Sequence, residues 1–493
     1  MLLEPVTTRA DRASALSAAF AVALTAALAV SFLGEKGFWL DEALSVQRAS
    51  GGWAALWHDI TGSQANMALY YVLLHWWIAL GDSEVVVRAL SALFAVATVP
   101  VVYRLTSRLF GGRAAVTAAL LLALNSFFIS YAQEARGYSL AVLLSALATW
   151  QFVIAVERPS PRSWAWYAAS ASVALYAHFF CALVLLAHAA SLVFAHRAHR
   201  PWRSALAAGA VIGLAALPLI WFVAFRDVGQ IDWVPAPRAI DLYYLFATFA
   251  GGGWLLPALA GLAIVSAVVL AARRDSDDAP DRWRLALVVC WFVIPPVLAF
   301  VVSAAKPVFQ PRFLIVSVVP FVMLVAAGLA RLRHRVVFAT ALAVIAVLSG
   351  HSVRAWYDAP DKQWWRAAAQ HVSSQAAPGD AVGFYVYSAR VPFEYYARRI
   401  GLGDGRVTFV DLASSAFVAG NRQPEPSPAR LGSLAASHPR VWLVRLQDGT
   451  PPGHPLGRYE QSRAIESGLA ENYRMVQQTP FPGGIRIQLY ERR

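Results

Sequence analysis

Charged residues are scarce in this sequence of 493 residues. Asp, Glu, Lys and Arg make up 14% of the chain, whereas a soluble domain carries about 25%. Hydrophobic residues reach 58%. So few charges cannot cover a water-exposed surface, and the composition predicts a polytopic α-helical membrane protein. The net charge of +13 lies in short loops between apolar runs, so membrane topology explains it and no nucleic-acid partner is expected.

Cysteine is nearly absent, and several catalytic motifs are missing. Cys181 and Cys290 both lie inside apolar runs without CxxC spacing, so we expect buried thiols rather than a disulfide or a zinc site. The sequence has no HExxH, GxSxG or Walker A motif, which leaves out the enzyme classes that depend on them. The first apolar stretch lacks an A-x-A cleavage site, and we interpret it as a retained span.

Long apolar runs predict the membrane-spanning helices, each of which needs about 20 residues. The run 68–80 has about two-thirds of that length and ends in Trp76 and Trp77, so it predicts a helix lying in the membrane interface. Eleven other segments are candidate spans: 13–33, 84–107, 113–130, 138–156, 163–177, 178–195, 204–225, 254–272, 284–304, 312–330 and 336–350.

Arginine placement predicts the orientation. With the N-terminus in the cytoplasm, clusters of arginines fall in the cytoplasmic segments, and the outer loops hold only scattered basic residues, as the positive-inside rule requires. The first outer loop is then 34–83, and everything after about 351 lies outside. The arginines expected on the cytoplasmic side include Arg104, Arg108, Arg113, Arg158, Arg162, Arg197, Arg200, Arg203, Arg273, Arg274, Arg331, Arg333 and Arg335.

The tail differs from the rest of the chain. Residues 351–493 are richer in polar residues and Pro, and they predict a small extracytoplasmic α/β domain after a transmembrane unit of residues 1–350. No internal repeat is visible across the spans, which argues against a two-fold transporter. The expected elements of the tail are helices near 361–376, 391–399, 427–437 and 459–471, and strands near 381–387, 407–412, 440–446, 474–479 and 484–491.

The first outer loop carries two adjacent acids, Asp41 and Glu42, directly after Trp39. Adjacent carboxylates at a membrane surface can act as a general base or hold a divalent cation. The alternative is structural, with Asp41 as the N-cap of the following helix and Glu42 in its first turn. The pair alone does not decide between these interpretations.

Further polar residues fall on the same predicted face. Glu134 and Arg136 lie in a short loop, His178 lies in the outward turn of LYAHFF, and Lys306 and Arg312 lie in KPVFQPRF. Each has an ordinary alternative. Glu134 and Arg136 could contact headgroups or pair with each other, His178 could pack or cap among aromatics, and Arg312 could snorkel to headgroups. Their common sidedness favours function, because acids for base chemistry and cations for a phosphate are what transfer from a phospholipid carrier requires.

The ordered motifs WLDEALS, ALYYVLLHWW, GDSEVVVRALSALF, YAQEARGYSL, LYAHFF and QPRFLIVSVVPF resemble bacterial glycosyltransferase family 39, which is related to the dolichyl-phosphate-mannose protein mannosyltransferases. The resemblance implies a GT-C fold, a polyprenyl-phosphate sugar donor and transfer on the outer face of the cytoplasmic membrane. It gives Asp41 the acid/base role, with Glu42 beside it. The residues expected to bind substrate are Tyr70, Glu134, Arg136, His178, Lys306 and Arg312.

The resemblance leaves two points open. Some proteins of the wider fold hold a divalent cation, for which Asp41, Glu134 and His178 are the candidate ligands. Many relatives have His-Pro-Pro before the interfacial helix, where this chain has Asn66, Met67 and Ala68. We therefore expect a membrane glycosyltransferase, with a lipid or glycan transporter and a non-catalytic scaffold as alternatives. The sugar and the acceptor, which could be a glycan, a lipid or a protein, are not specified by the sequence.

Overall fold

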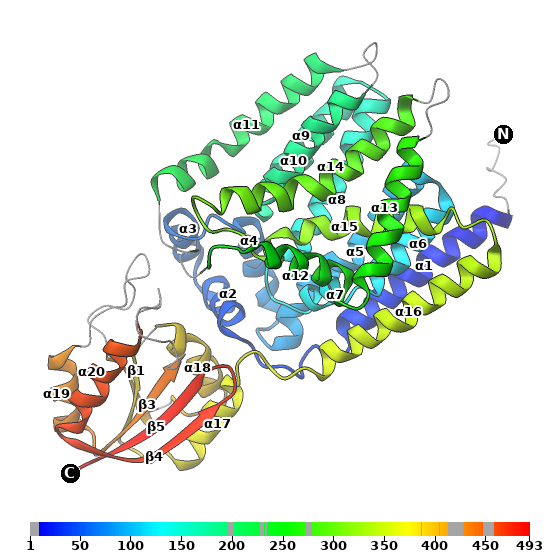
Figure 1. The fold of residues 1–493 in the computed structure, drawn as a ribbon. Helices are drawn as coiled ribbons and strands as arrows, with labels where there is room; N and C mark the ends of the chain where they lie inside the picture. The colour runs from blue at the N-terminus through cyan, green and yellow to red at the C-terminus, as the bar shows by residue number, and fades with distance from the viewer. Residues whose placement is uncertain are drawn as a thin grey trace, which may run out of the picture.

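The computed structural model describes residues 9–195, 201–226, 231, 234–272, 279–385, 387–403, 405–412, 427–446 and 458–493. It consists of a large bundle of helices and a separate unit in which helices pack on a five-stranded sheet (Figure 1). Among the arginines used to predict the orientation, Arg197, Arg200, Arg273 and Arg274 lie outside the described residues.

The bundle has a helix at each of the eleven predicted spans, although not all of these helices are long. Six of them are long and apolar enough to cross a membrane, or seven if the bent pair α6–α7 is one span. The count of eleven spans therefore stays a prediction. The helices are α1 (Arg9–Val30), α5 (Glu84–Phe110), α6 (Gly112–Ala123), α7 (Ser126–Ala132), α8 (Tyr138–Glu157), α9 (Pro161–Ala177), α10 (Cys181–Ser191), α11 (Trp202–Phe225), α13 (Leu256–Ala272), α14 (Ala279–Val302), α15 (Val318–Leu329) and α16 (Arg335–Asp358).

Shorter helices lie at one end of the bundle. Helices α2 (Leu40–Ser50), α3 (Trp53–Gly62) and α4 (Ala68–Trp77) follow α1, and α4 is too short to span, as predicted for the run 68–80. Helix α12 (Ala239–Ala250) was not predicted, because its 12 residues fall below the length of a span. Trp53, Trp57 and Trp76 are exposed, as expected for side chains at a membrane interface.

A bend between α6 and α7 directs the second outer loop toward the first. The two helices meet at an angle of 60°. Asn125 stabilises the break, since its Oδ1 accepts a hydrogen bond from the backbone N–H of Phe128 and its Nδ2 donates to the carbonyl of Phe249. The asparagine therefore caps α7 and ties it to α12.

The C-terminal unit contains one mixed sheet with strand order β2-β1-β3-β5-β4. Strand β1 (Asp380–Phe384) pairs in parallel with β2 (Val407–Asp411) and β3 (Arg440–Leu446), and β5 (Ile485–Arg492) is antiparallel to β3 and to β4 (Tyr473–Phe481). The helices are α17 (Trp365–Gln375), α18 (Tyr387–Arg399), α19 (Pro428–Ser437) and α20 (Arg458–Ala470). These elements confirm the predicted order of helices and strands, but α16 extends to Asp358, beyond the expected boundary at residue 351.

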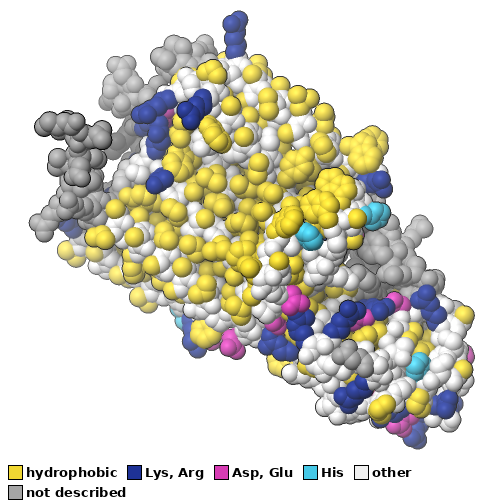
Figure 2. All heavy atoms as spheres, turned by 180° about the vertical axis from the view of Figure 1, so that it is seen from behind, with side chains coloured by type: hydrophobic (Ala, Val, Ile, Leu, Met, Phe, Trp, Pro, Cys, Tyr) yellow, Lys and Arg dark blue, Asp and Glu magenta, His cyan; other side chains and the backbone are white. Residues whose placement is uncertain are grey.

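The two ends of the bundle carry different groups. At one end, Glu157 pairs with Arg108 at 2.5 Å and with Arg284 at 2.8 Å, and all three residues lie in or beside segments predicted to be cytoplasmic. The predicted outer loops gather at the other end, next to the C-terminal unit. Figure 2 shows a broad hydrophobic surface over the bundle, and charges of both signs where the bundle meets that unit. This arrangement agrees with the predicted sidedness, whose direction stays a prediction.

Candidate active site

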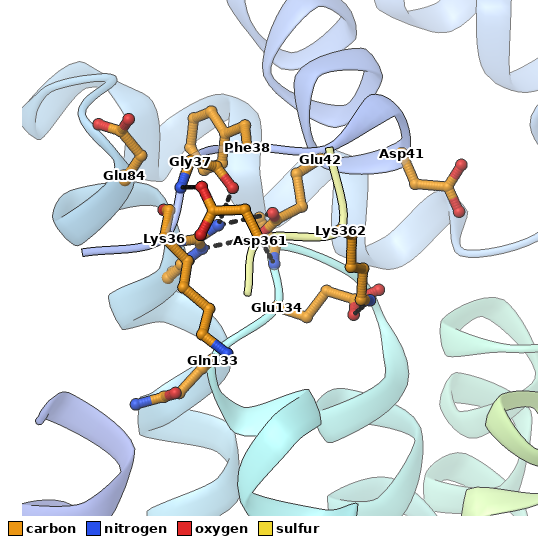
Figure 3. A network of polar contacts seen from close by, with 12 residues as sticks. Lys36, Gly37, Phe38, Asp41, Glu42, Glu84, Gln133, Glu134, Asp361 and Lys362 are labelled. Carbon is orange, nitrogen blue, oxygen red and sulfur yellow. Dashed lines mark hydrogen bonds and ion pairs between the residues drawn. The ribbon is translucent and has the colours of Figure 1, made fainter. Parts of the chain in front are cut away.

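Helix α2 directs its two acids to different surroundings. Its N-cap is Trp39, which makes no side-chain capping bond, so Asp41 is not the N-cap that the structural alternative expected. Both acids lie in the first turn, where the helix dipole favours negative charge. Glu42 points into a polar network and Asp41 points away from it (Figure 3). The Asp41 side chain is 21% exposed and that of Glu42 only 2%.

Glu42 is held by a buried arginine. Arg88 of α5 donates from Nε to one carboxylate oxygen at 2.8 Å and from Nη2 to the other at 2.7 Å, and the backbone N–H of Ala135 donates to Oε1 at 3.0 Å. Glu42 therefore joins α2, α5 and the second outer loop, which favours a positioning role over proton transfer. Arg88 also donates to the carbonyls of Leu33, Lys36 and Gly37.

Arg88 was not singled out in the sequence, because it lies within a predicted span. A lone arginine in an apolar run is costly unless it is paired, so its presence in such a run could have pointed to a buried partner. The partner lies 46 residues away in the sequence, and only the fold shows it.

Asp41 lies beside two arginines from separate segments, Arg136 from the loop before α8 and Arg312 from the 3-10 helix Pro311–Ser317. Its Oδ2 is 3.4 Å from Nη1 of Arg312 and 4.0 Å from Nη2 of Arg136. Arg136 also donates from Nη1 to the hydroxyl of Tyr71 at 2.9 Å. Burial lowers the pKa of Arg136, but Tyr71 and Asp41 outweigh that effect and raise it, so the guanidinium stays charged. The site thus combines one partly exposed carboxylate with two fixed cations.

Several buried polar atoms near this group have no hydrogen-bond partner within the described part of the chain. They are the hydroxyl of Tyr138, Nε2 of His178, Nε of Arg136 and Oε1 of Glu134. The ring of His178 lies 5.7 Å from that of Tyr138, measured between centroids. Buried polar groups in proteins are nearly always hydrogen-bonded, so their gathering around Asp41 indicates a place where a polar ligand binds.

His178 is a neutral donor in this arrangement. It lies in the turn after α9, and its Nδ1 accepts a hydrogen bond from the backbone N–H of Phe180, so the ring proton is on Nε2. Burial, with smaller effects from Arg136 and Arg312, lowers the pKa of His178 to about 3. The imidazole can therefore donate one hydrogen bond to a ligand without adding charge.

Glu134 is paired with a residue that the sequence did not point to. Nζ of Lys362, from the segment between α16 and α17, lies 2.6 Å from Oε2 of Glu134 and 4.1 Å from the centroid of the Trp39 ring. Burial raises the pKa of Glu134, and the charge of Lys362 works against that rise. Lys362 lies in the predicted C-terminal domain, where we expected no site residue.

Two expected substrate-binding residues lie elsewhere. Tyr70 is fully buried and shares a hydrogen bond of 3.0 Å with Ser91, which donates to the carbonyl of Arg136. It therefore lies behind the loop that carries Arg136, and its neighbour Tyr71 contacts the guanidinium instead. Lys306 is exposed in the loop after α14. A role in binding substrate stays a prediction for both residues.

The residue that replaces the expected histidine has a structural contact. Oδ1 of Asn66 accepts a hydrogen bond from the backbone N–H of Phe179 at 3.1 Å, next to His178. Asn66 thereby fixes the turn that presents the imidazole.

The three candidate metal ligands do not form a cation site in this arrangement. The described residues contain no group of three or more His, Cys, Asp or Glu side chains suited to hold a metal ion. Asp41 faces two guanidinium groups, Glu134 faces an ammonium group, and His178 lies near the same arginines. Positive charge from the protein occupies the places around these ligands, so the donor set does not fit a divalent cation.

Comparisons with known proteins bear on the family and the fold. Residues 64–222 match the sequence model of the dolichyl-phosphate-mannose-protein mannosyltransferase family. No curated protein sequence matches significantly. The solved structures that share the fold at low identity include the following three. ArnT from Cupriavidus metallidurans matches in the apo state with a TM-score of 0.63, at 13% identity over 98% of each chain. ArnT bound to undecaprenyl phosphate matches with a TM-score of 0.61, at 14% identity over 96% of this chain and 97% of that one.

The third structure is an oligosaccharyltransferase from Archaeoglobus fulgidus in complex with Zn and sulfate. It matches with a TM-score of 0.55, at 15% identity over 87% of this chain and 67% of that one. Such low identities establish the fold alone. The chain thus has the fold of the GT-C membrane glycosyltransferases, and residues 64–222 match the dolichyl-phosphate-mannose-protein mannosyltransferase family.

Proposed function

We propose that this protein is a membrane glycosyltransferase that moves a sugar from a polyprenyl-phosphate donor to an acceptor hydroxyl at the outer face of the cytoplasmic membrane. The observation that carries the proposal is the position of Asp41, a partly exposed carboxylate beside Arg136 and Arg312. One acid with room for an acceptor and two cations for a phosphate are the groups that such a transfer needs.

In the proposed reaction, the carboxylate of Asp41 takes the proton of the acceptor hydroxyl. The hydroxyl oxygen forms a bond to the anomeric carbon of the sugar as the bond from that carbon to the phosphate oxygen breaks. The electron pair of the broken bond stays on the polyprenyl phosphate, which leaves with an added negative charge. Arg136 and Arg312 stabilise this charge, because a guanidinium can donate two parallel hydrogen bonds to a phosphate.

Neutral donors complete the proposed phosphate site. The hydroxyl of Tyr138 and Nε2 of His178 are buried, and within the described residues they have no protein partner. Donors held in place by the fold stabilise a developing charge without a reorganisation cost. The undecaprenyl phosphate bound to the ArnT structure supports a polyprenyl-phosphate donor for this chain as well. The sugar and the acceptor stay open.

The proposal includes the predicted topology. The N-terminus is cytoplasmic, the bundle of residues 1–350 crosses the membrane about eleven times, and residues 351–493 lie outside. Sharing of Glu157 by arginines of two predicted cytoplasmic segments supports this orientation, as does the gathering of the predicted outer loops at the opposite end. A catalytic metal is not part of the proposed mechanism, because Asp41 already faces two cations.

A transporter would place its functional charges near the middle of the membrane. The charged residues described above lie at the two ends of the bundle instead. A buried histidine deeper in the bundle, His188, is enclosed by its own partners. It lies within hydrogen-bond distance of Thr149 and Tyr167, and its ring stacks on Phe152 at 4.6 Å between centroids. These contacts make His188 a packed polar residue of the bundle.

The test is release of polyprenyl phosphate by purified protein given a panel of polyprenyl-phosphate sugars. Asp41→Asn should lower kcat by about 10²–10⁴-fold, the usual contribution of a general base. Asp358→Asn removes an acid from the end of α16, where Asp358 pairs with the exposed Arg354, and should keep wild-type turnover. Wild-type turnover by Asp41→Asn would rule out Asp41 as the base, and no release from any donor would rule out the proposed function.

A further inference from the structure

The segment 359–364, which joins α16 to α17 and is called the linker below, binds the backbone of the first outer loop. Oδ2 of Asp361 accepts a hydrogen bond from the N–H of Gly37 at 2.8 Å, and Oε1 of Gln363 accepts one from Leu40 at 2.9 Å. The hydroxyl of Tyr396, in α18, accepts the N–H of Phe38 at 2.5 Å. Three side chains from after the last predicted span thus bind the amides that lead into α2.

The contact leaves little space beside one glycine. A Cβ atom on Gly37 would lie 3.2 Å from Oδ2 of Asp361 and 3.2 Å from the hydroxyl oxygen of Tyr396. With a side chain there, both groups would have to move by a few tenths of an ångström. The sequence at Gly37 is therefore matched to two residues that lie more than 320 positions later.

A second set of contacts joins the C-terminal unit to the start of α5. Glu84, the first residue of that helix, pairs with Arg366 at 2.7 Å and accepts a hydrogen bond from Tyr396 at 2.9 Å. Arg366 also donates to the carbonyl of Gly34 in the first loop, at 3.1 Å. Arg399 of α18 pairs with Asp82. The unit is consequently held against the bundle on both sides of the loop that carries Asp41.

The linker also delivers a cation to the site. Lys362 lies between Asp361 and Gln363, so the residues that bind the loop backbone also fix the direction of its side chain. Its ammonium group reaches Glu134 (Figure 3). The same group lies over the ring of Trp39, the residue before α2. A cavity of about 30 Å³ between the first loop and the linker is lined by Lys362, Glu134 and Glu42 among others, which is room for about one water molecule.

We propose that the C-terminal α/β unit is a working part of the active site, in which the linker fixes the approach to Asp41 and Lys362 is a positioning residue that acts through Glu134. This inference rests on the proposed function for its catalytic part and on the contacts alone for its structural part. The ion pair of Lys362 with Glu134 joins the linker to the second outer loop, and this pair holds the loop in the arrangement that places Arg136 beside Asp41.

Several other groups act on Glu134 and bear on any pH dependence. The charge of Glu42 opposes its ionisation and that of Arg312 favours it. Arg136 lies two residues away on the same loop, and Tyr131 and Tyr138 are near enough to interact with its charge. Removing Lys362 leaves one acid and two arginines around Glu134, so the pKa of Glu134 should rise when the ammonium group is lost.

Hydrogen exchange followed by mass spectrometry tests the structural part without substrate. In Asp361→Ala and Tyr396→Phe, the amides of Gly37 and Phe38 should exchange about tenfold faster or more, because each loses its acceptor. Peptides from α8 should be unchanged. Asp358→Ala, at the end of α16 just before the linker, is the matched control. Unchanged exchange of the first loop in both variants would overturn the structural part.

Transfer kinetics test the catalytic part. Lys362→Met should lower kcat while the KM for the donor changes little, and the acid limb of the pH–kcat profile should move to higher pH. Lys362→Arg should restore most of the rate, and Arg354→Met, which removes an exposed cation of α16, should have no effect. In a Glu134→Gln background, Lys362→Met should lower kcat little further, because the carboxylate through which Lys362 acts is already gone.

The outcomes separate the two proposals. The role of Lys362 would be overturned if Lys362→Met kept full activity and the wild-type pH profile. It would also be overturned if the losses of kcat in Lys362→Met and Glu134→Gln added in the double variant. Either result would leave the proposed transferase activity intact. Failure of the wild-type protein to use any donor would instead overturn the proposed function. The exchange experiment then still decides whether the linker fixes the first loop.

Discussion

Replacing Arg88 by methionine should destabilise the protein by about 3–5 kcal/mol, the usual cost of removing one partner from a buried ion pair. The side chains of Arg88 and Glu42 are only 5% and 2% exposed, so water cannot replace the lost partner. The variant leaves the carboxylate of Glu42 with the N–H of Ala135 but no cation. It also removes the donors to the carbonyls of Leu33, Lys36 and Gly37, which shape the first outer loop.

The assay is the free energy of unfolding in mixed micelles, measured by titration with a denaturing detergent. Arg108→Met is the matched control, because Arg108 pairs with Glu157 at the other end of the bundle with side chains 28% and 19% exposed. That variant should cost about 1 kcal/mol or less, since partly exposed pairs contribute little. Adding Glu42→Gln to Arg88→Met should recover part of the loss, because the unpaired charge is gone. Equal losses of unfolding free energy in Arg88→Met and Arg108→Met would refute the reasoning. Strictly additive effects of Arg88→Met and Glu42→Gln would refute it as well.

Three further predictions follow from individual contacts. Tyr71→Phe should lower kcat about tenfold in the transfer assay, because it removes a hydrogen bond to the charged Arg136, whereas Tyr70→Phe should change kcat less; equal effects would contradict the assignment of the contact to Tyr71. His178 is neutral in the folded state down to about pH 3 but takes up a proton near pH 6.5 when unfolded. Its contribution to stability is therefore full above about pH 6.5 and is lost as the pH falls toward 3. His178→Gln should weaken the dependence of the thermal unfolding temperature on pH over that range. Burial raises the pKa of Asp380, but its hydrogen bonds outweigh burial and hold that pKa below its ordinary value. The stabilisation by Asp380 is therefore present above about pH 4 and lost as the pH falls through the folded pKa. An Asp380→Asn variant whose stability falls with acid pH in the same way as that of the wild type would contradict this.

Local pattern was enough for much of the fold. Apolar runs predicted the positions of the bundle helices, and alternating patterns and turn residues in the tail predicted the order of the helices and strands found there. The short run 68–80 was placed correctly at the end of the bundle, because its length and its terminal tryptophans are local properties. The convergence of Asp41, Arg136 and Arg312 followed from their predicted sidedness, because loops at the same end of a helical bundle lie close together.

Pairings between distant segments could not be read from the sequence. The contact of Lys362 with Glu134 joins residues 228 positions apart, and no local pattern links the linker to the second outer loop. The same is true of Arg88, whose partner Glu42 had two reasonable interpretations until the fold supplied the arginine. Tyr70 and Tyr71 illustrate a third limit. Adjacent tyrosines on a short helix point in different directions, and only the packing of α4 decides which one reaches the site.

The place of β5 in the sheet has a consequence for how the protein is made. This strand contains nearly the last residues of the chain, yet it lies inside the sheet, between β3 and β4. The sheet cannot close until β5 has been synthesised and lies beside β3 and β4. The N-terminal loop with Asp41 is made first, but the side chains that bind its backbone come from the linker and α18 beside that sheet. Assembly of the site is therefore a late event in biogenesis, and a chain that stops short of its last strand should insert into the membrane without becoming a competent enzyme.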